Sequence, residues 1–148
     1  MKTIDELRIR AAEQIEKIRR ILNDSKTIAV VGLSPKPHRP SNQVACYLME
    51  AGYTIIPVNP GHDSILGLPS YPNLRAIPAP VDMVDIFRRQ EEVLPIVEDA
   101  ISIGARFIWM QEGIVDREAA AKAEKAGLIV VMDRCTKIDH MYLLKKLN

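Results

Sequence analysis

Short apolar strands alternate with amphipathic helices along most of this sequence, and this alternation limits the available folds more than any other feature. Runs rich in β-branched residues predict strands, whereas apolar positions at helical spacing predict helices. The predicted strands span residues 27–32, 53–58, 81–87, 106–110 and 128–132. The predicted helices span residues 41–52, 95–104 and 116–127, with a short closing helix from Asp139 onward. This order predicts an α/β fold, a Rossmann-like doubly wound sheet of about five parallel strands flanked by helices.

An additional helix is predicted before the first strand, because apolar side chains recur along one of its faces. These side chains are Ile4, Leu7, Ala11, Ile15, Ile18 and Leu22. We expect this N-terminal helix, within residues 1–24, to pack on an α/β core of residues 25–148, so that residues 1–148 form a single domain. The same stripe could instead contact a second copy of the chain or an unidentified protein partner. Residues 59–80 carry five prolines and are assigned no element.

Charge and apolar patterning exclude several classes of partner. The formal net charge is +1, so neither nucleic acid nor an anionic membrane surface is expected to bind. No apolar run approaches the ~20 residues of a membrane span, and the charged N-terminus lacks the apolar core of a signal peptide. The two cysteines, Cys46 and Cys135, make no disulfide framework and indicate a reducing compartment. We therefore expect a cytoplasmic protein.

The loop after the first predicted strand, GLSPKPHRPS, is the strongest candidate for ligand binding. Ligands of parallel sheets bind beyond the carboxyl ends of the strands, and this loop lies there. An NAD site would need several glycines and an acid after the second strand, but the loop has one glycine and three prolines, and no carboxylate ends the second strand. The loop instead offers hydroxyls and cations beside a helix N-terminus, which suits phosphate. These residues are Ser34, Lys36, His38, Arg39 and Ser41, and Arg88 and Arg89 follow the third strand at the same edge.

Five segments resemble, in order and spacing, the small stand-alone CoA-binding proteins. The segments are GLSPKPHRPS, PVNPGH, VDMVDIFRR, WMQEGI and MDRC. They also look like the CoA-binding domain of the succinyl-CoA synthetase α subunit, and the resemblance covers about residues 25–141. It implies a Rossmann-like domain that binds coenzyme A at the carboxyl ends of the strands.

The resemblance also implies a role for each segment. The loop around the CoA phosphates would comprise Gly32, Leu33, Ser34, Lys36, Arg39 and Ser41. The adenosine would be bordered by Val58, Asn59 and Pro60. The nucleotide and pantetheine would be flanked by Phe87, Arg88 and Arg89, and the pantetheine arm by Gln111, Glu112 and Gly113. The residue types agree with this, because CoA carries a pyrophosphate and a 3′-phosphate, and a proline-stiffened loop loses less entropy on binding.

Catalytic groups are not assembled by the sequence. The synthetase uses a phosphorylated histidine of a second domain and a nucleotide-binding partner subunit, and we expect this chain to lack both. His38, His62 and His140 lack metal-ligand spacing with the two cysteines, so no metal is expected. The leading interpretation is therefore a protein that binds CoA or acyl-CoA without catalysis of its own. The alternatives are a subunit of an acyl-CoA ligase or transferase whose catalytic parts lie on another chain, and an NAD(P)-binding Rossmann protein.

Cys135 is the one reactive side chain expected at the ligand edge. It follows the fifth strand beside Arg134, with Lys137 two residues farther on, and neighbouring cations favour a thiolate. We expect a small residue buried behind the strand end; the alternative is a thiol that forms a mixed disulfide with CoA. Asp82 and Asp85, three residues apart in a strand, are expected on opposite faces and make no catalytic pair.

Overall fold

A parallel five-stranded sheet forms the centre of the computed structural model, which describes residues 1–144. Its strands are β1 (Thr27–Val31), β2 (Thr54–Val58), β5 (Met83–Ile86), β6 (Phe107–Met110) and β7 (Ile129–Val131). They lie in the order β2-β1-β5-β6-β7. The predicted Rossmann-like fold is thereby confirmed.

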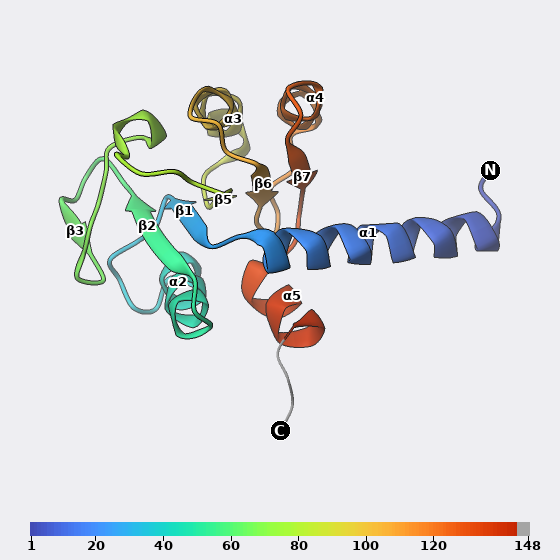
Figure 1. Cartoon of the computed structure of the whole chain (residues 1–148), viewed down its shortest axis with the longest axis horizontal. Helices are drawn as coiled ribbons and strands as arrows, with labels where there is room; N and C mark the ends of the chain where they lie inside the picture. The colour runs from blue at the N-terminus through green and yellow to red at the C-terminus, as the bar shows by residue number, and fades with distance from the viewer. Residues whose placement is uncertain (145–148) are drawn as a thin grey trace.

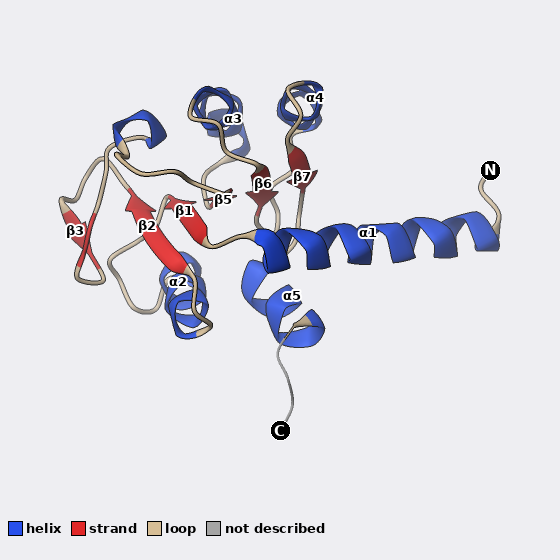
Figure 2. Cartoon of the chain, in the orientation of Figure 1, coloured by secondary structure: helices blue, strands red, loops and turns tan. Residues whose placement is uncertain are grey.

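Helices cover both faces of this sheet (Figure 1). One face carries α2 (Pro40–Glu50), α5 (Thr136–Leu143) and the end of α1 (Ile4–Asp24), and the other carries α3 (Val93–Ser102) and α4 (Arg117–Lys125). Because side chains of a strand alternate between faces, one strand supplies both hydrophobic layers. Phe107 and Trp109 of β6 pack toward α1 and α2, whereas Ile108 and Met110 pack toward α3 and α4. Figure 2 shows the resulting three layers.

The strand order reverses at β1, and this reversal opens the sheet's carboxyl edge. β1 pairs with β2 on one side, where Thr27 lies opposite Thr54, and with β5 on the other, where Ile28 lies opposite Met83. The chain leaves β1 toward α2 on one face and leaves β5 toward α3 on the other. Two neighbouring loops therefore diverge, which creates the crevice where such sheets bind ligands.

The N-terminal helix packs on the core over its last turns only. Ile18, Ile21 and Leu22 are buried, but Ile4 is 69% exposed and Leu7 is 53% exposed. The expectation that the whole stripe packs on the domain is therefore wrong for the first half of α1, which extends beyond the sheet (Figure 1). No helix among the described residues is long and apolar enough to cross a membrane.

Three predicted helix starts differ from the observed ones, whereas the predicted cap of α4 is confirmed. α2 begins at Pro40, before the predicted start at residue 41, because proline fits the first helical position. α3 begins two residues before Pro95, after the short helix η2 (Gln90–Glu92). α5 begins at Thr136 instead of Asp139, whose carboxylate binds Arg134. The side chain of Asp116 accepts a hydrogen bond from the backbone of Ala119, as expected of the α4 cap.

The proline-rich segment after β2 is folded against that strand. It contains a small hairpin of β3 (Ser64–Ile65) and β4 (Leu68–Pro69), followed by the short helix η1 (Leu74–Ala76). The backbone N–H of Asn59 donates to the carbonyl of Tyr71 at 2.9 Å, which ties the end of the segment to the end of β2. The segment thereby forms one side wall of the ligand edge.

Candidate functional site

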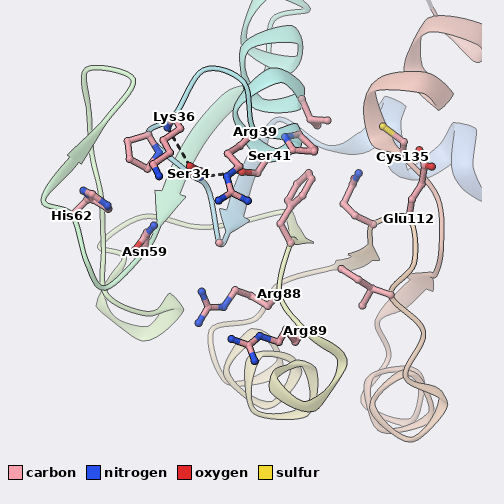
Figure 3. Close-up of a pocket in the computed structure, with 17 residues that line it drawn as sticks. Ser34, Lys36, Arg39, Ser41, Asn59, His62, Arg88, Arg89, Glu112 and Cys135 are labelled. Carbon is pink, nitrogen blue, oxygen red and sulfur yellow. Dashed lines mark hydrogen bonds between the residues drawn. The ribbon is translucent and has the colours of Figure 1, made fainter.

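A cavity of about 910 Å³ opens at the carboxyl edge of the sheet (Figure 3). Its size lies near the upper end of the about 300–1,000 Å³ that is usual for ligand pockets. The loops after β1, β2, β5 and β6 form its walls, and they bring together eleven of the predicted site residues. These are Gly32, Ser34, Lys36, Arg39, Ser41, Asn59, Phe87, Arg88, Arg89, Gln111 and Glu112.

Four predicted site residues lie outside this cavity. Leu33 is fully buried in the core, and Gly113 lies in the turn after β6 without lining the cavity. Val58 and Pro60 line a neighbouring cavity of about 340 Å³, on the α3 side of the sheet. Gly32 and Arg88 line both cavities, so the two spaces meet at the strand-order switch.

Hydrogen bonds brace the loop after β1. The backbone N–H of Ser34 donates to the Ser41 hydroxyl at 3.0 Å, and the backbone N–H of Lys36 donates to the Ser34 hydroxyl at 3.1 Å. The Asn42 amide donates to the carbonyl of Ser34 at 2.9 Å, and the Asn59 amide donates to the carbonyl of Leu33 at 3.0 Å. Both serine hydroxyls act as acceptors in these bonds, so each keeps its own proton for a ligand.

The single glycine of this loop is needed for a close approach to the next loop. Gly32 has a φ of +88°, and a Cβ there would lie 2.4 Å from the carbonyl oxygen of Phe87 and 2.8 Å from Cδ of Arg88. Any other residue would force the loops after β1 and β5 apart. Gly32 therefore brings the cations of the two loops to opposite sides of one cavity (Figure 3).

The rim of the cavity is strongly cationic. Lys36 and Arg39 are exposed and have no ion-pair partner among residues 1–144. Arg88 contacts Glu92 at 2.8 Å, and Arg89 lies 4.0 Å from Glu91. The first turn of α2 lacks a side-chain cap, because its N-cap residue is Arg39. The positive end of the helix dipole therefore adds to the side-chain charges at this rim.

The other end of the cavity is formed by more deeply buried polar side chains, with the exposed carboxylate of Glu112 beside them. Gln111 is 5% exposed, and its Oε1 accepts hydrogen bonds from the backbone N–H of Thr136 at 3.2 Å and from the Thr136 hydroxyl at 3.0 Å. The Thr136 hydroxyl also lies 3.0 Å from Oδ2 of Asp85. Burial raises the pKa of Asp85 to about 8, and the hydrogen bond to Thr136 opposes this shift.

Two further cavity residues that carry chemistry, His62 and Cys135, were not among the residues assigned to CoA, although Cys135 was expected at the ligand edge. Both lie in the segments quoted for the resemblance, so proximity to those segments was the available signal. Cys135 is half-buried and lines the cavity beside Gln111, so its expected position behind the strand end is wrong. Asp82 accepts hydrogen bonds from the backbone of Lys26 and Thr27 and takes no part in the site. No group of three potential metal ligands occurs among the described residues.

Comparison with known proteins gives this geometry a context. A family model described as a CoA binding domain matches residues 26–141. The Bacillus subtilis protein YneT, described as uncharacterized, is 42% identical over 124 residues, which cover 84% of this chain and 92% of YneT. A hypothetical protein from Pyrococcus horikoshii OT3 has a solved structure that is 44% identical, with a TM-score of 0.86 over 88% of this chain and 92% of that one.

A much larger enzyme also matches in part. Acetate–CoA ligase (ADP-forming) I from Archaeoglobus fulgidus is 30% identical over 120 residues. The match covers 74% of this chain but only 18% of the ligase.

Proposed function

The chain belongs to the CoA-binding domain family, and on that premise we propose that it binds coenzyme A or an acyl-CoA at the carboxyl edge of its sheet, without catalysis of its own. The observation that carries the proposal is the convergence of cations from two loops on one cavity at the strand-order switch. Such a site suits a ligand with several phosphates, because guanidinium and ammonium groups form charge-assisted hydrogen bonds with phosphate oxygens.

The phosphates are assigned to the space between the loops after β1 and β5. Lys36 and Arg39 approach from one side, together with Ser34 and Ser41, and Arg88 approaches from the other (Figure 3). The prolines of the loop remove backbone donors, so recognition depends on side chains and on the N-terminus of α2. This differs from a dinucleotide site, in which glycines let the backbone itself approach the pyrophosphate.

The adenosine is assigned to the neighbouring cavity between β2 and α3. Val58, Pro60 and Leu74 give it apolar walls, and it joins the phosphate site at Gly32 and Arg88. The pantetheine arm is assigned to the opposite end, where Gln111, Glu112 and Cys135 line the main cavity. The long shape of CoA would thus follow the row of strand ends from β2 to β7.

Calorimetric titration with CoA tests the proposal, together with native mass spectrometry of freshly purified protein. We expect Arg39→Gln to weaken CoA binding about tenfold, because it removes one exposed charged phosphate contact of about 1.5 kcal/mol. Arg117→Gln is the matched control, since Arg117 is exposed on α4 and lines neither cavity. Absence of CoA binding at millimolar concentration would overturn the proposed function.

A titration with NADPH separates this proposal from the alternative of an NAD(P)-binding protein. The bases of both ligands could enter the same crevice, but the loop after β1 has one glycine and three prolines, so its backbone cannot approach a dinucleotide pyrophosphate closely. We expect CoA to displace NADPH. Tighter binding of NADPH would show that the ligand is wrong although the fold is right.

The partial match to the acetate–CoA ligase supports a second candidate, a CoA-binding subunit that acts with another chain. In that case, the thioester chemistry would occur only when the catalytic chain is added. An assay of acyl-CoA formation with this chain alone and together with the catalytic chain separates the two candidates, because turnover that needs both chains favours the subunit. We expect no turnover from the isolated chain.

The cytoplasmic location and a homodimer stay predictions.

A further inference from the structure

A chain of hydrogen bonds leads from the interior of the sheet to the buried end of the cavity. It begins at Asp85, which is fully buried in β5, and passes through Thr136, the first residue of α5. It ends at Gln111, whose side chain lines the cavity. The three residues come from separate segments, so the fold itself brings them together.

Each contact in this hydrogen-bond chain holds a proton in only one protonation state of Asp85. The Thr136 hydroxyl lies 3.0 Å from Oδ2 of Asp85 and 3.0 Å from Oε1 of Gln111, but a hydroxyl has one proton to donate. If Asp85 is ionised, that proton goes to the carboxylate, and two lone pairs face each other across the contact to Gln111. If Asp85 is neutral, it donates to Thr136, and Thr136 donates to Gln111. Every contact then holds a proton.

The remaining oxygen of Asp85 supports the same state. Oδ1 of Asp85 is buried and has no hydrogen-bond partner within residues 1–144. An unpaired oxygen costs less in a neutral acid than in a carboxylate, because a buried charge loses far more hydration. Burial raises the pKa of Asp85 to about 8, with no charged side chain contributing to the shift. The charged side chains on neighbouring segments are Arg88 after β5, Glu112 after β6 and the Arg134–Asp139 ion pair around the start of α5.

The orientation of the Gln111 amide is fixed by the same contacts. The backbone N–H of Thr136 can only donate, so the atom that faces it at 3.2 Å must be Oε1 and not the amide nitrogen. The amide nitrogen therefore points away from Thr136, and it has no hydrogen-bond partner among the described residues. Because Gln111 lines the cavity, this nitrogen is available as a donor to a ligand.

We propose that Asp85 is a positioning residue that, as a neutral acid, holds Gln111 through Thr136 so that the Gln111 amide nitrogen donates to an amide carbonyl of the pantetheine arm. The inference rests on the proposed function, since it assigns the arm to this end of the cavity. Ionisation of Asp85 withdraws the Thr136 proton from Gln111 and loosens the donor. Affinity for CoA should therefore fall in alkaline solution, whereas affinity for the phosphate-bearing part alone should not.

The test compares two probes, CoA and adenosine 3′,5′-bisphosphate, which lacks the pantetheine arm, by calorimetric titration at pH 7 and pH 9. For wild-type protein we expect CoA affinity to fall about two- to tenfold between these values, the worth of one neutral hydrogen bond. Affinity for the bisphosphate should fall less than affinity for CoA between the same two pH values. His62 and Cys135 also line the cavity, and both are retained in every variant, so any pH dependence of their own is common to all the profiles.

Three variants isolate the hydrogen-bond chain. Asp85→Val and Thr136→Val each remove a link and should weaken CoA binding about two- to tenfold at pH 7. Asp85→Asn restores a permanent donor to Thr136, so it should rescue the affinity that Asp85→Val loses and should abolish the additional fall at pH 9. Infrared spectra of wild type and Asp85→Asn at pH 7 give a second measurement, because the neutral acid has a carbonyl band that asparagine lacks.

The outcomes separate this inference from the proposed function. Failure of wild-type protein to bind CoA overturns both. CoA binding with the same pH profile in wild type and Asp85→Asn overturns the inference alone, and so does an infrared spectrum that shows Asp85 ionised at pH 7.

Discussion

The two ends of the cavity use opposite means to present polar groups. At the end formed by the loops after β1 and β5, the charged side chains are exposed, and the side chain of Arg89 is 84% exposed. At the end formed by β6 and α5, Asp85 and Thr136 are fully buried and Gln111 is 5% exposed. The first end presents cations close to solvent, whereas the second presents buried hydrogen-bonding groups behind one exposed carboxylate, that of Glu112.

This difference shows how one sheet edge can recognise a ligand whose two halves differ. Exposed cations attract phosphates over distances of about a Debye length and tolerate small displacements, but salt screens them. Buried neutral donors contribute less attraction, yet each fixes a direction, because a buried donor without a partner costs free energy. The phosphate end therefore supplies attraction, and the buried end supplies alignment.

The largest expected effect concerns the buried end and is a change in stability. The pKa of Asp85 is about 8 in the folded protein against 3.8 for the ordinary group, so between these values the folded state keeps a proton that the unfolded state loses. Stability therefore falls as pH rises from about 4 to about 8. Asp85→Asn removes this dependence and should raise the free energy of unfolding by about 2–5 kcal/mol at pH 8, with little gain at pH 4.

Urea unfolding at both pH values measures this difference. Asp99→Asn is the matched control, because the side chain of Asp99 is 30% exposed and pairs with Arg75 on the surface. Its effect should be small and should not grow with pH in the same way. Equal pH dependence of stability in wild type and Asp85→Asn would mean that Asp85 is ionised in the folded protein, and the contrast between the two ends would be lost.

The next effect concerns the junction of the loops at the phosphate end. Gly32→Ala should destabilise the protein by about 2–4 kcal/mol, because the new Cβ meets the backbone of Phe87 in a left-handed conformation. Gly127→Ala is the control, since Gly127 has a φ of +94° but no atom within 4 Å of its Cβ position. Gly127→Ala should lower the free energy of unfolding by only about 1 kcal/mol. Denaturant unfolding of both proteins isolates the close approach, and equal losses would contradict its importance.

The exposed end could be predicted from the sequence much better than the buried end. A cation in a loop after a predicted strand points to the ligand edge whatever its neighbours are, so order along the chain predicts Lys36, Arg39 and Arg88 at that edge, where they line the cavity. The parallel sheet was predictable for a similar reason, since βαβ alternation permits few topologies. These features depend on local patterns.

The buried chain depends on contacts between distant residues, which no local pattern reveals. Asp85 and Thr136 are 51 residues apart, and neither was a candidate for the site. The apolar stripe of α1 misled for the opposite reason, since a local pattern shows that a face is apolar but not what covers it. For Leu33 the same order along the chain does not show which way the side chain points, and its side chain is buried in the core between Gly32 and Ser34, which line the cavity.

The third prediction concerns how salt affects binding at the two ends. Raising the ionic strength from about 0.05 M to about 0.5 M should weaken CoA binding by wild-type protein several-fold, because the exposed cations are screened. In Arg39→Gln this dependence should be shallower. In Gln111→Ala the affinity should be lower at every salt concentration, with the slope of wild type. Calorimetric titration gives all three slopes, and parallel slopes for wild type and Arg39→Gln would contradict attraction by exposed charge.

The smallest expected effect tests whether hydroxyls help the cations at the phosphate end. Ser34→Ala removes an acceptor that holds the backbone of Lys36 at 3.1 Å and a hydroxyl proton that faces the cavity. We expect CoA affinity to fall about threefold, since one neutral hydrogen bond is worth about 0.5–1.5 kcal/mol. Ser102→Ala on the exposed side of α3 serves as the control. Because the serine hydroxyl itself carries no charge, the loss at Ser34 should depend on ionic strength less than the loss at Arg39. A loss that vanishes at high salt would show that Ser34 acts only by placing Lys36, and the phosphate end would then rely on charge alone.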